Sequence, residues 1–185
     1  MSPEPSRPPS AAEARAAEEA RRAGARQELE AWFVERDGTR RPGIRDIWAE
    51  TIVTLVLAGS ALLAVVAPEE FVGVYFSLSC LAFLVGTGLF AVAMVVAARR
   101  SRAETIGVGG LFFMTGSAPQ WARRRLLGLL AAQVVVAVAA ASVRPFTPLA
   151  FGTLAPMLGL GCCGLWTARH GWFPPRDRGP AGRAA

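Results

Sequence analysis

Four long apolar stretches divide the chain, and polar segments rich in arginine separate them. A helix needs about 20 residues, at about 1.5 Å per residue, to cross the hydrocarbon core of a membrane. The pattern therefore predicts an all-α integral membrane protein with a four-helix transmembrane domain over residues 47–169. The predicted spans are residues 47–67, 71–98, 126–143 and 148–168.

The distribution of arginine predicts how these spans are oriented. Nine Arg precede the first span, none lies between the first two spans, six lie in residues 99–125, one lies in the next turn, and four follow from residue 169 onward. Short segments rich in Arg stay on the cytoplasmic side of a membrane. We therefore expect a multi-pass protein of the bacterial cell (inner) membrane, with the N-terminus and the C-terminus both cytoplasmic.

Residues 1–46 form a polar arm whose two parts differ in composition. Residues 1–10 contain four Pro and predict disorder. Residues 11–36 are rich in Ala, Glu and Arg, which favour a helix. This helix has one apolar cluster, which can lie on the bilayer surface or on the membrane domain: Leu29, Trp32 and Phe33.

Several residues mark the expected ends and bends of the spans. Asp46 is expected to cap the first span, and Tyr75 and Trp166 to lie in the aromatic belts at the two membrane interfaces. Pro156 should kink the fourth span, because proline lacks the backbone N–H of a regular helix. The tail, residues 170–185, is rich in Gly, Pro and Arg and is predicted to be disordered.

A stripe of small residues on the fourth span predicts a helix-packing face. Ala155, Gly159 and Cys163 recur every four residues, and therefore lie on one side of a helix. Small residues at this spacing let two helices approach closely inside a bilayer.

The connection between the second and third spans, residues 99–125, contains a glycine-rich apolar segment. Its core is the run Leu111, Phe112, Phe113 and Met114, which is too short to span a membrane. One interpretation is a surface loop whose side chains enter the inner leaflet or pack on the bundle. The other is a re-entrant or substrate-lining loop. In both cases we expect this connection to be the functional surface, because large apolar side chains are unfavourable in water.

Glu50 is the only acidic residue within a span. It follows the expected cap by four residues, about 6 Å along the helix axis. At that depth it should reach interfacial water and have a structural role, and the alternative is a coupling acid for protons or cations. Arg144, alone in the second outer turn, can form a latch to Glu69 and Glu70 of the first.

Composition excludes several classes of function. The net charge is +6 and every basic residue is Arg, but the charge falls where the topology requires it, which argues against a nucleic-acid partner. Three Cys and the single His170 lack the spacing of a metal or haem site. No nucleophile, phosphate-loop or paired-carboxylate motif is present. We therefore expect no enzyme activity, no catalytic residue, no cofactor and no bound metal.

Two segments resemble parts of known sequences. The stretch TIGVGGLFFMTGSAP at residues 105–119, and the stretch SVRPFTPLAFGTLAPM at residues 142–157 with the later GLW and RHG, look like segments of small uncharacterised actinobacterial four-span membrane proteins. The resemblance covers about residues 105–175. It implies a membrane protein of actinobacterial source and implies no activity.

The sequence leaves three hypotheses for function. The first is a non-enzymatic structural, assembly or accessory subunit, whose partners are the lipid bilayer and either another membrane protein or a second copy of itself. The second is a small dimeric transporter or permease-like protein that uses Glu50. The third, a membrane-embedded enzyme, is least favoured because the sequence offers no nucleophile or metal set. Transport requires water-accessible polar groups deep in the spans, and the spans offer only scattered ones such as Thr54 and Gln133, which favours the first hypothesis.

Overall fold

The computed structural model describes residues 10–38, 41–143 and 145–176. It divides into two units, Met1–Thr39 and Arg40–Ala185. The described part of the first unit is one helix, α1 (Ala11–Asp37), which covers the helix expected over residues 11–36. The disorder predicted for residues 1–9 lies outside the described residues.

A capping box begins α1. The Ser10 hydroxyl accepts a hydrogen bond from the Glu13 backbone N–H at 3.3 Å, and the Glu13 carboxylate accepts one from the Ser10 N–H at 2.7 Å. This reciprocal pair satisfies two donors that a helix start leaves unpaired. The hydrogen bond from the Ser10 backbone lowers the pKa of the Glu13 carboxyl. At the other end, the Arg36 guanidinium lies 4.3 Å from the centre of the Trp32 ring.

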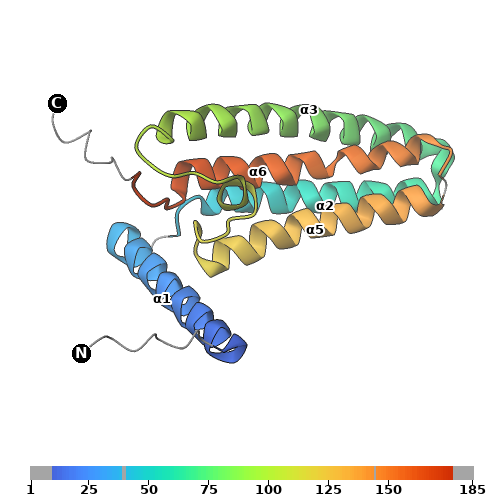
Figure 1. Ribbon diagram of the computed structural model, residues 1–185. Helices are drawn as coiled ribbons and strands as arrows, with labels where there is room; N and C mark the ends of the chain where they lie inside the picture. Colours follow the sequence, from blue (N-terminus) through green and yellow to red (C-terminus); the bar gives the residue numbers. More distant parts are fainter. Residues whose placement is uncertain (1–9, 39–40, 144, 177–185) are drawn as a thin grey trace, which may run out of the picture. The chain divides into compact units, whose positions relative to one another are not determined.

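The described part of the second unit contains four long apolar helical segments, which lie side by side as a bundle (Figure 1). The last segment is central: α6 packs most extensively on α3 and also contacts α5 and α4, while α2 packs on α3 and α5. All four segments are long and apolar enough to cross a membrane, and the chain is an all-α membrane protein. The elements are α2 (Ile44–Val66), α3 (Pro68–Arg100), α4 (Val108–Phe112), α5 (Gln120–Val143), η1 (Pro148–Leu154) and α6 (Pro156–His170).

Three helix starts differ from the sequence expectation, and the simplest case is α3, which begins at Pro68 rather than at residue 71. The cap of α2 is Gly43, in a left-handed conformation with φ of 66°, and Asp46 lies inside the first turn instead of capping it. A Cβ at Gly43 would lie 2.7 Å from Cδ1 of Trp166, so only glycine fits this position. The start of α5 is Gln120 rather than residue 126. Arg is a good helix former, so the three Arg after Ala122 extend the helix beyond its apolar part.

The fourth span changes helix type where Pro156 interrupts it. Residues Pro148–Leu154 form the 3₁₀ helix η1, in which the Ala155 N–H donates to the Gly152 carbonyl at 3.0 Å. Pro156 then occupies the first turn of α6, where its missing N–H is not needed. The expected kink therefore becomes a junction between two helices.

Close backbone contacts hold α6 against α3. A Cβ on Gly86 of α3 would lie 2.5 Å from the carbonyl carbon of Met157 and 2.6 Å from Cα of Leu158. A Cβ on Gly161 of α6 would meet the Gly86 carbonyl and lie 3.0 Å from Cβ of Leu89. The two backbones therefore touch at a pair of glycines, a contact that small residues permit between membrane helices.

Two aromatic residues expected in the interfacial belts are buried in the bundle instead. Tyr75 is 1% exposed, and its ring fills the space beside Gly152, where a Cβ would lie 2.6 Å from Cζ. Trp166 is 2% exposed, and its indole N–H donates to the Pro42 carbonyl at 3.2 Å. Both polar groups are thus directed toward protein rather than toward headgroups.

Candidate functional site

The α3–α5 connection and the first part of the tail fold over the end of the bundle where α2 begins and α6 ends (Figure 1). We call residues 101–119 and 171–176 together the end cap. The two segments of the end cap pair at Glu104 and Pro175, and the Thr105 N–H donates a hydrogen bond to the Pro174 carbonyl at 2.8 Å. The Trp172 N–H also donates to the Ser117 carbonyl, at 2.9 Å.

Three apolar side chains anchor the end cap in the bundle. Leu111, Phe112 and Met114 are 3%, 5% and 0% exposed. The Phe112 ring stacks on Phe90 of α3 with 4.6 Å between ring centres, and it occupies the space that Gly164 of α6 leaves open. Met114 has a positive φ of 54°, which costs a non-glycine residue free energy, so its complete burial must hold this conformation.

Phe113 points away from these anchors. Its side chain is 52% exposed, and that of Val108 in α4 is 71% exposed. Five arginines of the flanking segments are exposed as well: Arg99, Arg102, Arg123, Arg124 and Arg125. The end cap therefore presents two exposed apolar side chains on a backbone that its buried residues hold in place, and exposed arginines follow and precede it in the sequence.

A single arginine joins the end cap to the end of α6. The Arg100 guanidinium donates to the carbonyls of Ala168 and Gly171 at 2.8 and 3.0 Å, and forms an ion pair with Glu104 at 2.8 Å. Cations are favourable at the negative end of a helix dipole, and these carbonyls would otherwise lack partners. The Arg100 guanidinium also lies 5.3 Å from the centre of the Phe173 ring.

These contacts correct the expectation of a disordered tail over residues 170–185. His170 ends α6, residues 171–176 are hydrogen-bonded to the connection, and Phe173 is only 6% exposed. The reason is that the glycine and proline of this segment do not prevent backbone pairing with a neighbouring chain segment. The expectation for residues 177–185 lies outside the described part of the chain.

The second candidate site is the interior of the bundle around Glu50. The side chain is 2% exposed, and neither carboxyl oxygen has a hydrogen-bond partner among the described residues. The expectation that Glu50 reaches interfacial water is therefore wrong. Depth along the axis does not by itself decide whether a side chain reaches water, because the face of the helix matters as well. Ile47, Glu50, Thr54 and Leu57 share one buried face at helical spacing.

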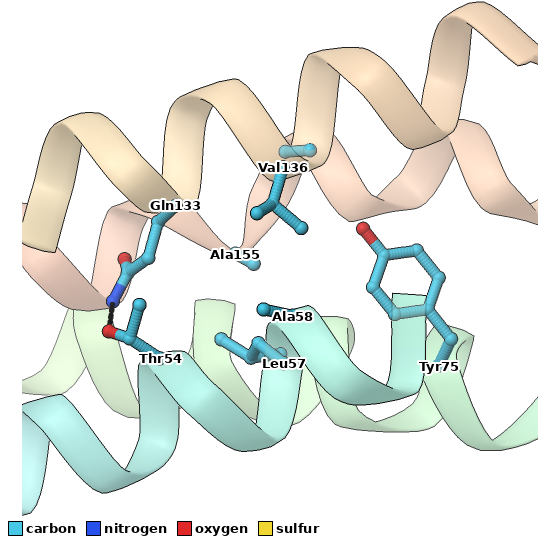
Figure 2. Close-up of a pocket in the computed structure, with 8 residues that line it drawn as sticks. Thr54, Leu57, Ala58, Tyr75, Gln133, Val136 and Ala155 are labelled. Atoms are coloured by element: carbon cyan, nitrogen blue, oxygen red, sulfur yellow. Dashed lines mark hydrogen bonds between the residues drawn. The ribbon is translucent and has the colours of Figure 1, made fainter. Parts of the chain in front are cut away.

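A small polar network lies one helical turn beyond Glu50. The Gln133 amide of α5 donates to the Thr54 hydroxyl at 2.8 Å and accepts from the Gly159 backbone N–H at 3.1 Å. Beside it is a cavity of about 10 Å³, enough for about one water molecule. Figure 2 shows the Thr54–Gln133 pair at one side of this cavity and Tyr75 at the other, with Ala58 and Val136 among the apolar residues between them.

The three residues of the predicted packing face are all buried. Ala155 is in the apolar cluster of Leu57 and Ala82, at the junction of η1 and α6. A Cβ on Gly159 would lie 3.1 Å from Cδ1 of Leu130 on α5 and 2.8 Å from the Gln133 amide oxygen. Cys163 is 0% exposed and belongs to a larger cluster: Ile47, Met114, Ala118, Ala122, Leu126 and Trp166.

The remaining candidate residues do not form a ligand site in the described ranges. No three His, Cys, Asp or Glu side chains there converge as metal ligands. The His170 ring packs on Trp166, with 5.4 Å between ring centres. Arg144, and with it the predicted latch to the first outer turn, lies outside the described residues.

Some important residues were not identified from the sequence. Arg100 has no local signal that sets it apart from the other arginines of residues 99–125, because the carbonyls that it binds are about 70 residues away along the chain. Gly86 and Gly152 carry no local signal, because their partners are on another helix. For Glu50 the sequence does carry a signal of burial on a polar face, because another polar residue, Thr54, lies four residues later on the same face of the helix.

The fold and these two sites define the class of the molecule as a four-helix membrane protein with an ordered cap at one end. Comparison with known proteins does not extend this: no family model, curated protein or solved structure matches the chain.

Proposed function

We propose that this protein is a non-enzymatic accessory or assembly subunit of the bacterial cell membrane, with both termini cytoplasmic, and that its end cap binds a partner membrane protein or a second copy of the chain. The observation that carries the proposal is the fixed conformation of the end cap. Buried Leu111, Phe112 and Met114, together with Arg100, hold exposed Phe113 and Val108 in place. A surface ordered before binding loses little entropy when a partner docks.

The interior supports this proposal over a solute transporter. The cavity between Thr54, Gln133 and Tyr75 holds about 10 Å³, whereas small-molecule sites usually occupy about 300–1,000 Å³. The contact between Gly86 and Gly161 also leaves no space between α3 and α6 at that level. The arginine distribution favours a cytoplasmic end cap, which soluble and membrane-bound partners could both reach.

The test is purification in a mild detergent followed by identification of bound proteins and measurement of the mass of the complex. We expect the wild-type protein to carry a partner, or a second copy, in a fixed ratio. The double variant Val108→Ser and Phe113→Ser should lose it. The matched control, Leu84→Ser and Val135→Ser on exposed faces of α3 and α5, should retain it. A monomeric wild-type protein without bound protein would refute the proposal.

A further inference from the structure

Glu50 is an acid buried without any compensating charge. Its two carboxyl oxygens are inaccessible and accept no hydrogen bond from the described residues. The ion pairs of the described bundle do not include it. The thiols of Cys162 and Cys163 on α6 lie near enough to Glu50 to interact with it electrostatically, and neither thiol is a cation.

A carboxylate in this position is unfavourable, because its hydration is lost and nothing replaces it. Burial of an unpaired charge costs several kcal/mol or more, and such a group normally becomes neutral instead. For a carboxylic acid the neutral form is the protonated one. The geometry therefore predicts that Glu50 holds a proton.

The surroundings of Glu50 are closed on one side and polar on the other. Toward the start of α2, Ile47 and Trp166 separate Glu50 from water, since their side chains are only 1% and 2% exposed. Toward the middle of the membrane the next turn carries Thr54, about 6 Å along the axis. Thr54 is bonded to Gln133 at 2.8 Å and lines the water-sized cavity with Tyr75 (Figure 2).

We propose that Glu50 is a proton-carrying site, and that its proton exchanges through a water molecule in the cavity that Thr54, Gln133 and Tyr75 line. Exchange breaks the O–H bond of the carboxyl as its proton passes to a water molecule from the cavity, and a proton from that water forms the new O–H bond. The carboxyl is therefore neutral before and after, and nothing is oxidised or reduced. This activity is separate from partner binding at the end cap.

The first test is infrared spectroscopy of the full chain in lipid vesicles at neutral pH, where exposed carboxyls are ionised. We expect a carbonyl band of a protonated carboxylic acid that Glu50→Gln removes completely. The control is Glu70→Gln, at an exposed carboxyl of α3, which should leave the band unchanged. Absence of a Glu50-dependent band would show an ionised carboxylate and overturn the proposal.

The second test follows the exchange of this proton. On transfer to D₂O the band should shift to lower frequency, and Thr54→Val, which removes the hydroxyl at nearly constant shape, should slow the shift at least several-fold. Thr51→Val is the matched control, because the Thr51 hydroxyl donates to the Ile47 carbonyl within α2. A band that never shifts, or that shifts equally fast in Thr54→Val, would refute the exchange route. Partner retention is unaffected in either case, so the two proposals fail separately.

Discussion

The contact between α3 and α6 predicts a large difference between two glycines of the same helix. Gly86→Ala and Gly88→Ala make the same chemical change two residues apart in α3. A Cβ at position 86 would lie 2.5 Å from the carbonyl carbon of Met157, whereas nothing lies within 4 Å of a Cβ at position 88.

The magnitude follows from this geometry. Ordinary van der Waals contact begins at 3.4 Å, so Gly86→Ala requires the two backbones to separate by about 1 Å. A gap of that size forfeits about a quarter to a half of each neighbouring dispersion contact, and overpacking of this kind typically costs about 1–3 kcal/mol. Both variants gain the same helix propensity, so the difference between them reports packing alone.

The assay is reversible unfolding in mixed micelles, titrated with a denaturing detergent and followed by tryptophan fluorescence. We expect the free energy of unfolding to be about 1–3 kcal/mol lower for Gly86→Ala than for Gly88→Ala, a difference of roughly 5- to 150-fold in the unfolding equilibrium. Equal free energies would show that α3 and α6 do not touch at this point, and the packing of the central helix would be wrong.

Three further predictions concern other parts of the chain. A single cysteine at Glu69, in a cysteine-free background, should be labelled from outside intact cells by an impermeant reagent, and one at Ala103, an exposed position of the end cap, should not; the reverse result would invert the topology. Gly159→Leu should lower the free energy of unfolding by about 1–3 kcal/mol, because its side chain would meet α5, and an unchanged value would place this face against lipid. Ser10→Ala removes the hydroxyl of the capping box but keeps the backbone N–H, which is the larger cause of the lowered Glu13 pKa, so an NMR titration should show that pKa rising only part of the way toward the ordinary carboxyl value. Because the pKa is lowered in the folded chain, the box stabilises α1 above the ordinary carboxyl pKa and loses this effect as the pH falls through the lowered value. An unshifted titration would show that the hydroxyl takes no part in the box.

The features that depend on local sequence could be predicted. The four apolar stretches define helices because composition alone fixes their environment, and the Ala, Glu and Arg of residues 11–36 favour a helix without tertiary contacts. The capping box also has a local sequence pattern, Ser10 followed three residues later by Glu13, at the start of α1.

The features that depend on contacts between distant segments could not be predicted. Burial of Tyr75 depends on the absence of a side chain at Gly152, more than 70 residues later. The order of the tail depends on Arg100 and on pairing at Glu104, where composition suggested only flexibility. Asp46 is a better cap by residue type than Gly43, but Trp166 requires a glycine at the turn, and the helix begins there instead.

Site-specific photo-cross-linking in native membranes tests the proposed role of the end cap most directly. A photoreactive amino acid replaces Phe113, which is 52% exposed, and in a separate variant replaces Leu84 on the exposed face of α3, which is 67% exposed. We predict that position 113 forms a discrete cross-linked product with one protein, a partner or a second copy of the chain, and that position 84 forms none. Cross-links from position 113 to lipid alone, or the same products from both positions, would contradict the account.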